Sequence, residues 1–175
     1  IHIHDLDFYA TGTLTCCQTD PLRLFEDGGF NTGHGHLRTP NSIGSYGALA
    51  AIILQANQNE QHGGQSIPNF DYAMAPGVNK SFRKALKRSI KEYEDFTDKK
   101  LKVEIPDDLS YGDKETLKKL KIPESVINHA NEDVERQTFQ AMEGFVHNLN
   151  TMHSRAGAQV PFTSINFGTD TSEAG

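Results

Sequence analysis

Residues 124–152, ESVINHANEDVERQTFQAMEGFVHNLNTM, carry the strongest periodic signal in this chain of 175 residues. Apolar residues recur three or four positions apart, which predicts an amphipathic helix. The apolar stripe consists of Ile127, Ala130, Val134, Thr138, Ala141 or Met142, Phe145, Leu149 and Met152. At 1.5 Å per residue this helix would be roughly 40 Å long. Gly157 would close it.

Two further helices are predicted nearer the N-terminus. Residues 43–57 have apolar or small side chains on nearly every side, which indicates a buried helix with close neighbours. Pro40, Asn41 and Ser42 supply its start. Residues 81–97 form an amphipathic pattern with one charged face. The Lys-rich stretch 99–122 is interpreted as an exposed insert with a short helix at 114–120.

The remaining segments predict short strands and one loop. Strands are expected at 1–9, 13–18, 65–70 and 160–167, and the glycine-rich stretch 28–39 is expected to be a loop. Read in order, the chain is strand, strand, helix, strand, helix, helix, strand. This order indicates an α/β fold, barrel-like rather than a finished sheet.

Composition excludes several classes of protein. The chain is 36% hydrophobic and 23% charged, which is ordinary for a globular protein and unlike collagen or a disordered chain. Its net charge of −6 argues against wrapping of duplex nucleic acid, which needs a basic surface. The longest apolar run, 48–54, is too short to span a bilayer. The two cysteines cannot build a disulfide framework, which favours a reducing intracellular compartment.

The adjacent Cys16 and Cys17 are the first candidates for chemistry. Successive side chains of a strand point to opposite faces, so one sulfur can face a cavity while the other faces the packing layer. Three interpretations stay open at this point. The pair can be two small buried hydrophobes, a redox or radical centre, or a strained vicinal disulfide.

His2 and His4 share one face of the first predicted strand. A His-x-His pair at a strand end is one way to hold zinc in a barrel hydrolase. The further ligands could come from His34, His36 and His62, which lie on predicted loops. In the alternative interpretation, His2 and His4 are hydrogen-bonded polar residues that line a cavity.

Glycines beside polar residues form a second kind of candidate. The segments HGH at 34–36 and HGGQS at 62–66 allow a ligand to approach the backbone closely, although neither matches a known phosphate-binding fingerprint. A basic run on the helix at 81–97 could meet nucleotide phosphates or form a solvated face. It consists of Lys80, Arg83, Lys84, Lys87, Arg88 and Lys91.

Five separated motifs together resemble one family, the anaerobic (class III) ribonucleoside-triphosphate reductases. They are HIHDLD at 2–7, TCCQ at 15–18, FNTGHG at 30–35, QHGGQSIPNFD at 61–71 and QVPFTSINF at 159–167. The resemblance covers nearly the whole chain and is weakest at 99–122. Several motifs in register are far more specific than any one of them.

The resemblance implies a glycyl radical enzyme built on a ten-stranded α/β barrel, of which this chain would be one part. Such enzymes reduce ribonucleoside triphosphates to deoxyribonucleotides, the precursors of DNA. A radical on a C-terminal glycine passes to a cysteine on a loop inside the barrel, and the thiyl radical takes the 3′ hydrogen of the ribose. A second cysteine, on a strand, takes part in removing the 2′ hydroxyl. By its motif Cys16 is this catalytic cysteine, and Cys17 points away.

The resemblance also implies the surroundings of the site. Residues expected near the substrate or formate are His2, His4, Asn41, Ser42, His62, Gly63, Gly64, Gln65 and Ser66. No metal ligand is expected in this chain. The glycyl radical, the thiyl cysteine, the zinc-binding cysteines and the nucleotide-binding regulatory domain would lie outside it, and the reductant would be formate or a dithiol.

The implied partners are ribonucleoside triphosphates, nucleotide effectors including ATP, a radical SAM activating enzyme and a second copy of the protein. Neither membrane nor nucleic acid is expected, and the compartment is the cytoplasm. Two other functions compete with this interpretation. One is a metal-dependent barrel hydrolase that uses His2 and His4, and the other is a nucleotide-binding module without chemistry.

Overall fold

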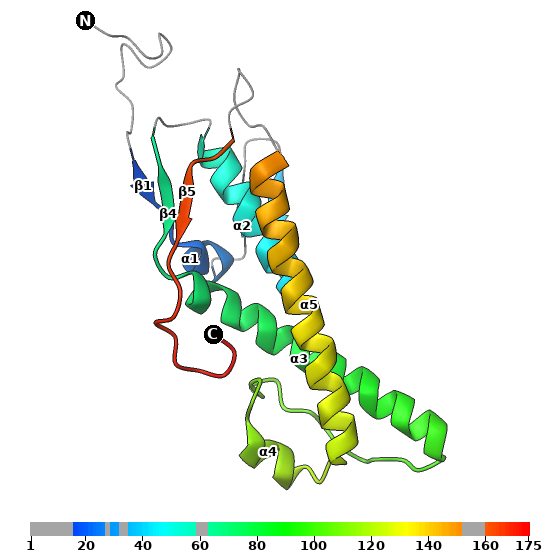
Figure 1. Ribbon diagram of the computed structural model, residues 1–175. Helices are drawn as coiled ribbons and strands as arrows, with labels where there is room; N and C mark the ends of the chain where they lie inside the picture. Colours follow the sequence, from blue (N-terminus) through cyan, green and yellow to red (C-terminus); the bar gives the residue numbers. More distant parts are fainter. Residues whose placement is uncertain (1–15, 27–28, 32–34, 59–62, 152–159) are drawn as a thin grey trace, which may run out of the picture.

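Two helices pack along a third to form the core of the computed structural model, which describes residues 16–26, 29–31, 35–58, 63–151 and 160–175. Helices α2 (Ile43–Gln58) and α3 (Phe70–Thr97) both lie against α5 (Glu124–Thr151) (Figure 1). The predictions of helices at 43–57 and 124–152 are confirmed to within one residue at each end. Their apolar stripes supply much of the buried core.

Small residues allow these helices to approach one another closely. A Cβ atom on Gly47 of α2 would lie 3.2 Å from the carbonyl oxygen of Ala141 in α5. A Cβ atom on Gly77 of α3 would lie 2.8 Å from Cδ2 of Tyr46 in α2. Both distances are shorter than ordinary carbon contacts of about 3.5–4.0 Å. A side chain at position 77 would therefore force a shift at the crossing of α2 and α3, whereas one at position 47 would require α5 to yield by a few tenths of an ångström.

Helix α3 begins eleven residues earlier than the sequence pattern predicts, so the predicted start at residue 81 is wrong. The added turns contain Pro76 and Gly77, both of which disfavour a helix interior. Tertiary packing overrides that preference, because Phe70, Met74 and Val78 in the same turns are buried against the neighbouring helices.

Three short strands form a parallel sheet in the order β1–β4–β5. They are β1 (Cys17–Gln18), β4 (Gln65–Ile67) and β5 (Thr163–Ile165). Each lies inside a predicted strand but is shorter. All the helices between them lie on one side of the sheet (Figure 1). The α/β class is thus confirmed, whereas the ten-stranded barrel stays a prediction. The strand predicted at 1–9 lies outside the described residues.

The loop predicted at 28–39 is wrong in part, because this stretch contains a hairpin. Strand β2 (Gly29–Asn31) pairs antiparallel with β3 (His36–Arg38). Helix α1 (Pro21–Glu26) was not predicted, although Asp20 and Pro21 form a helix-start signal. Asp20 Oδ1 accepts a hydrogen bond from the Leu22 amide at 3.2 Å, and proline occupies the first helical position. Its Phe25 is buried, with its ring edge-on to that of Tyr46 at a centroid distance of 4.8 Å.

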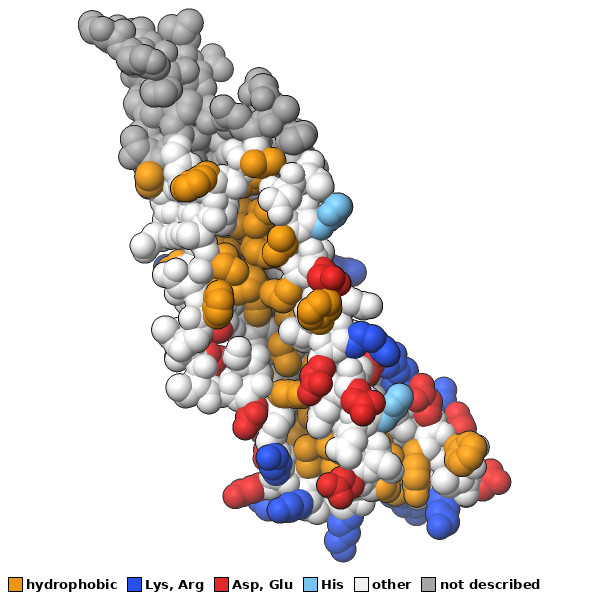
Figure 2. Space-filling model, viewed as in Figure 1, with side chains coloured by type: hydrophobic (Ala, Val, Ile, Leu, Met, Phe, Trp, Pro, Cys, Tyr) orange, Lys and Arg blue, Asp and Glu red, His pale blue; other side chains and the backbone are white. Residues whose placement is uncertain are grey.

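Residues 99–122 lie over the far ends of α3 and α5 and contain α4 (Lys114–Lys119) near the predicted position. Asp113 caps α4 by accepting a hydrogen bond from the amide of Thr116 at 3.0 Å. Charged side chains gather at this end of the molecule (Figure 2). The segment nevertheless buries four apolar side chains, which belong to Ile105, Leu109, Leu117 and Ile122.

Tyr111 ties this segment to both long helices. Its ring lies edge-on to Phe82 of α3 at 5.5 Å, and its hydroxyl donates to Glu135 of α5 at 3.0 Å. Burial, and then the Glu135 carboxylate, raise the pKa of Tyr111 to about 12.

Among the described helices, none combines the length and apolar character that crossing a membrane requires.

Candidate functional site

The register of the parallel sheet arranges side chains in two rows on opposite faces. The first row consists of Cys17, Gln65 and Thr163, which are paired across the three strands. The second row consists of the residues that follow them, Gln18, Ser66 and Ser164. Gln65 is 3% exposed and faces α2, where its amide nitrogen donates to the Leu54 carbonyl at 2.8 Å. Because side chains alternate along a strand, the second row faces away from the helices.

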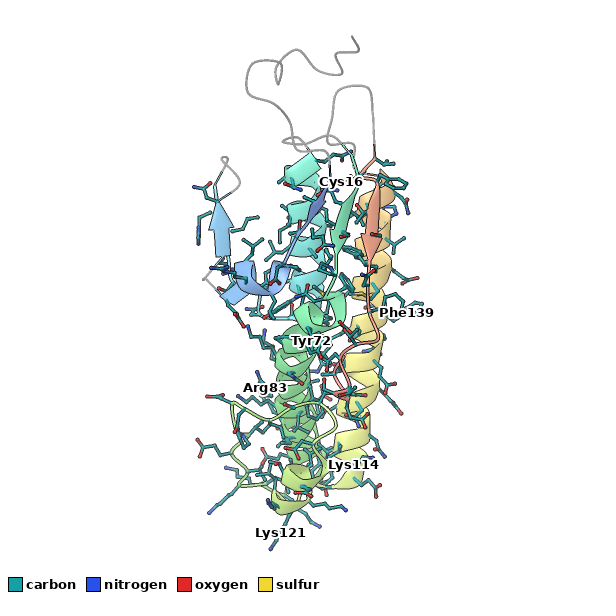
Figure 3. The ribbon with its side chains drawn as sticks, turned by 90° about the vertical axis from the view of Figure 1, so that its left-hand side faces the viewer. Cys16, Tyr72, Arg83, Lys114, Lys121 and Phe139 are labelled. Carbon is teal, nitrogen blue, oxygen red and sulfur yellow. The ribbon has the colours of Figure 1, made fainter. Side chains whose placement is uncertain are left out.

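We call this second row with its surroundings the open face of the sheet. Gln18 and Ser164 are exposed on it and Ser66 is half-buried. In Figure 3, which looks onto this side, no described helix lies in front of the strands. The open face therefore presents amide and hydroxyl groups next to β1.

The two cysteines differ in environment, as strand alternation predicts. Cys17 is half-buried, and its sulfur accepts a hydrogen bond from Nδ2 of Asn57 in α2 at 2.8 Å. Cys16 is exposed and precedes the strand at its upper end (Figure 3). Both are free thiols, and their opposite placement leaves only Cys16 on the side of the open face.

The glycine-rich motif lies beside these cysteines. Gly63 has a positive φ of 105°, and the Gly64 carbonyl accepts the Cys17 amide at 3.2 Å. A Cβ atom on Gly64 would lie 3.2 Å from Cδ1 of Phe162, so β4 and the approach to β5 are close here. The structure thus brings Gly63, Gly64, Gln65 and Ser66 to Cys16, with the side chain of Gln65 turned toward α2.

Asn41 and Ser42 lie at the other end of α2, a helix of 16 residues and therefore roughly 24 Å long. The Asn41 carbonyl accepts a hydrogen bond from Lys84 at 2.8 Å, and the Ser42 hydroxyl lies 3.0 Å from that of Ser45. The structure does not bring these two residues together with Cys16. His2, His4 and His62 lie outside the described residues.

Part of the basic run on α3 is engaged in contacts within the protein. Lys80 donates to the Pro40 carbonyl and to the Tyr46 hydroxyl, both at 3.0 Å. Arg83 donates to the Leu109 carbonyl at 2.7 Å, and Arg88 pairs with the buried carboxylate of Asp133. These contacts hold neighbouring segments together, whereas Lys87 and Lys91 are exposed, as a solvated face predicts.

Asp71, at the start of α3, fixes the chain that follows β5. Its Oδ2 accepts the amides of Thr169 at 2.7 Å and Asp170 at 2.8 Å, and its Oδ1 accepts the amide of Tyr72 at 2.9 Å. The Asp170 amide, followed by those of Tyr72 and Thr169, lowers the pKa of this carboxyl to about 2, although burial acts in the opposite direction. The position of β5, and with it Ser164, is thereby tied to α3.

Comparison with known proteins identifies the family to which these motifs belong. The family model for anaerobic ribonucleoside-triphosphate reductase matches residues 1–175, which is the whole chain. The chain belongs to the anaerobic ribonucleoside-triphosphate reductase family. The resemblance inferred from the five motifs is therefore confirmed.

Individual reductases of this family match over nearly the same length. The chain is 30% identical over 172 residues to the anaerobic ribonucleoside-triphosphate reductase of Enterobacteria phage T4. The matched stretch covers 98% of this chain and 23% of the phage protein. It is 27% identical, again over 98% of the chain, to the reductases of Haemophilus influenzae and Escherichia coli, of which it covers 20%. The chain thus spans about a fifth of the length of the reductases it matches.

Two polar residues of the open face were missed by sequence reasoning, namely Gln18 and Ser164. Gln18 lies two positions after Cys16, so strand alternation was a signal that could have placed it on the same face. Ser164 joins the row through the pairing of β4 with β5, and no pattern in the sequence indicates that register. Among the described residues of this reductase-family chain, no cluster of three His, Cys, Asp or Glu side chains could hold a metal ion.

Proposed function

We propose that this chain forms one wall of a radical active site in which ribonucleoside triphosphates are reduced to 2′-deoxyribonucleoside triphosphates. The observation that carries the proposal is the contrast between the two cysteines. Cys16 is exposed beside the polar open face, whereas the sulfur of Cys17 is hydrogen-bonded to Asn57 on the opposite side. Family membership supplies the reaction, and this contrast selects the thiol.

In the proposed reaction the C2′–O bond of the ribose breaks and a C2′–H bond forms. Replacing the hydroxyl by hydrogen consumes two electrons and two protons and releases one water. The electrons come from formate, which is oxidised to carbon dioxide, or from a dithiol, which is oxidised to a disulfide. Cys16 takes part in removal of the 2′ hydroxyl, and the radical-bearing glycine and cysteine lie outside this chain.

The neighbours of Cys16 have groups suited to a sugar or phosphate ligand. Hydroxyl groups both donate and accept hydrogen bonds, and a carboxamide offers one oxygen and two N–H donors. Ser66, Ser164 and Gln18 bring these groups to one row of the sheet. We place the substrate against this row.

The same proposal accounts for the edges of the sheet. Within the described residues β1 and β5 each pair with β4 alone, so their outer edges have unpaired backbone groups. Closure of a barrel would pair them and exclude water from the radical. Nucleotide effectors, a radical SAM activating enzyme and a second copy of the protein are the partners that this function requires.

The test compares Cys16→Ser with Cys17→Ser in the complete gene product that carries this chain. We expect Cys16→Ser to abolish deoxynucleotide formation and to leave triphosphate binding within severalfold. Cys17→Ser is the matched control, because serine also accepts the Asn57 hydrogen bond and should cost only about 1 kcal/mol of packing. Product is measured by chromatography and binding by equilibrium dialysis.

Two results would contradict the proposal. Full turnover by Cys16→Ser would remove this thiol from the mechanism. A stoichiometric metal ion that is lost on substitution of His2 and His4, together with hydrolysis of a substrate, would favour the barrel hydrolase.

A further inference from the structure

A chain of carboxamide hydrogen bonds connects the last turn of α2 to the sulfur of Cys17. The Asn57 amide nitrogen donates to Cys17 Sγ and to Gln65 Oε1, both at 2.8 Å. The Gln65 amide nitrogen donates in turn to the Leu54 carbonyl at 2.8 Å. Leu54 and Asn57 belong to the same helix, so Gln65 closes a ring between β4 and α2, and Cys17 is joined to this ring.

The burial of this ring restricts it to one arrangement. Gln65 is among the most buried polar residues described, and Asn57 and Cys17 are half-buried. A buried amide that lacks a partner is costly, so each side chain is held by its neighbour. An apolar residue at position 57 could fill the same space, but it would not specify where the Cys17 sulfur lies.

Strand β1 needs such an anchor because little else in the described structure holds it. It is two residues long and pairs only with β4 among the described strands. The nearby backbone contacts are the Cys17 amide to the Gly64 carbonyl at 3.2 Å and the Thr19 amide to the Ser66 carbonyl at 2.8 Å. A rotation or slip of so short a strand would exchange the faces of adjacent residues.

We propose that Asn57 and Gln65 are positioning residues that hold the Cys17 sulfur against α2 and thereby keep Cys16 on the open face. Asn57 acts through Cys17, and Gln65 acts through Asn57. The catalytic consequence rests on the function proposed above for Cys16. The positional consequence does not, because it concerns only which thiol is accessible.

The first experiment measures accessibility without reference to activity. The complete gene product is treated with iodoacetamide in its native state, and fragment ions from cleavage between residues 16 and 17 give the label on each cysteine. The variants are Asn57→Leu, which replaces the amide by an apolar group of similar size, and Asn57→Asp, which keeps the volume and loses the N–H donors. Gln55→Leu is the control, since Gln55 lies on the same helix and donates to the Asn148 carbonyl at 3.2 Å.

We expect the ratio of Cys17 to Cys16 labelling to rise about three- to tenfold in both Asn57 variants. This range corresponds to the free energy lost with one hydrogen bond. Gln65→Leu should raise it in the same direction, and Gln55→Leu should leave it unchanged. Circular dichroism verifies that each variant folds. Because Asn57→Asp preserves the side-chain volume, its ratio decides the question if Asn57→Leu does not fold.

The second experiment measures turnover of the same variants. A positioning role predicts that kcat falls at least tenfold in the Asn57 variants while KM for the triphosphate changes less than twofold. An unchanged labelling ratio in Asn57→Asp, or an equal rise in Gln55→Leu, overturns the inference. The inference is also overturned if the Asn57 variants change the labelling ratio but keep an unchanged kcat while Cys16→Ser is inactive. An altered ratio together with full turnover by Cys16→Ser supports the positional role and rejects the proposed function instead.

Discussion

Substitution of Gly77 by alanine tests the close crossing of α2 and α3. The new Cβ atom would lie 2.8 and 2.9 Å from the Tyr46 ring atoms Cδ2 and Cγ and 3.2 Å from Cα of Ile43. The ring has little freedom to move away, because Phe25 packs edge-on against it and its hydroxyl accepts a hydrogen bond from Lys80. The contact with Ile43 involves backbone, so the helices themselves must separate.

The expected cost follows from two opposing effects. Alanine favours a helix interior over glycine by about 1 kcal/mol, whereas overpacking of a core costs about 1–3 kcal/mol. Because relief requires backbone movement, we place the clash near the upper end and expect a net loss of about 1–2 kcal/mol. Gly144→Ala in α5 is the matched control, since its added Cβ would meet no described heavy atom within 4 Å apart from its chain neighbours and the backbone of its own helix. That variant should gain up to about 1 kcal/mol.

Hydrogen exchange of the complete gene product, followed by mass spectrometry, measures both changes locally. A loss of 1–2 kcal/mol corresponds to exchange about 5–30 times faster, and we expect this in peptides from both α2 and α3 of Gly77→Ala. Peptides from α5 of Gly144→Ala should exchange at the same rate or more slowly. Slower exchange in Gly77→Ala would show that the crossing can relax and would refute the packing argument.

Two further predictions concern the core and the carboxylate of Asp71. Because the pKa of Asp71 in the fold is about 2, below its ordinary 3.8, its contribution to stability should be complete above about pH 4 and lost as the pH falls through 2. Its partners lie near the surface, so we expect a contribution of about 1–2 kcal/mol to stability. Asp71→Asn should remove this pH dependence, measured by hydrogen exchange of residues 168–171. If the exchange of that variant kept the same dependence on acid pH, the carboxylate would be excluded as its source. Phe82 is 0% exposed, and its ring packs against Tyr111. Phe82→Ala should therefore lower the free energy of unfolding by about 3–5 kcal/mol and make residues 99–122 susceptible to trypsin. Tryptic resistance equal to that of the unchanged chain would contradict this role of Phe82.

Helix periodicity predicted the helices whose apolar residues recur over several turns. The helices at 43–57 and 124–152 were found to within one residue, because each presents an apolar face over several turns. The first turns of α3 were missed because Pro76 and Gly77 act against a helix locally, and the packing that compensates is supplied by α2. The hairpin of β2 and β3 was missed because strands of three residues are too short to show alternation.

The candidate site was predictable only as far as local geometry reaches. Alternation along one strand predicts opposite faces for Cys16 and Cys17, which the structure confirms. Which face is open depends on where α2 lies, and the Asn57 contact joins residues 40 positions apart. Ser164 enters the row through pairing with a still more distant strand. These relations are properties of the tertiary structure.

The parallel sheet also sets the order in which the chain can fold. The partner of Gln65 in β1 lies 48 positions earlier in the sequence, whereas its partner in β5 lies 98 positions later. At a synthesis rate of about 5–20 residues per second, β4 waits roughly 5–20 s on the ribosome before β5 is made. The hydrogen bonds within each helix are local and α2 can pack against α3 meanwhile, but the packing of both against α5 also waits until α5 is made. The face that carries Cys16 is therefore completed late, and the yield of native protein depends on how well the free edge of β4 is shielded during that interval.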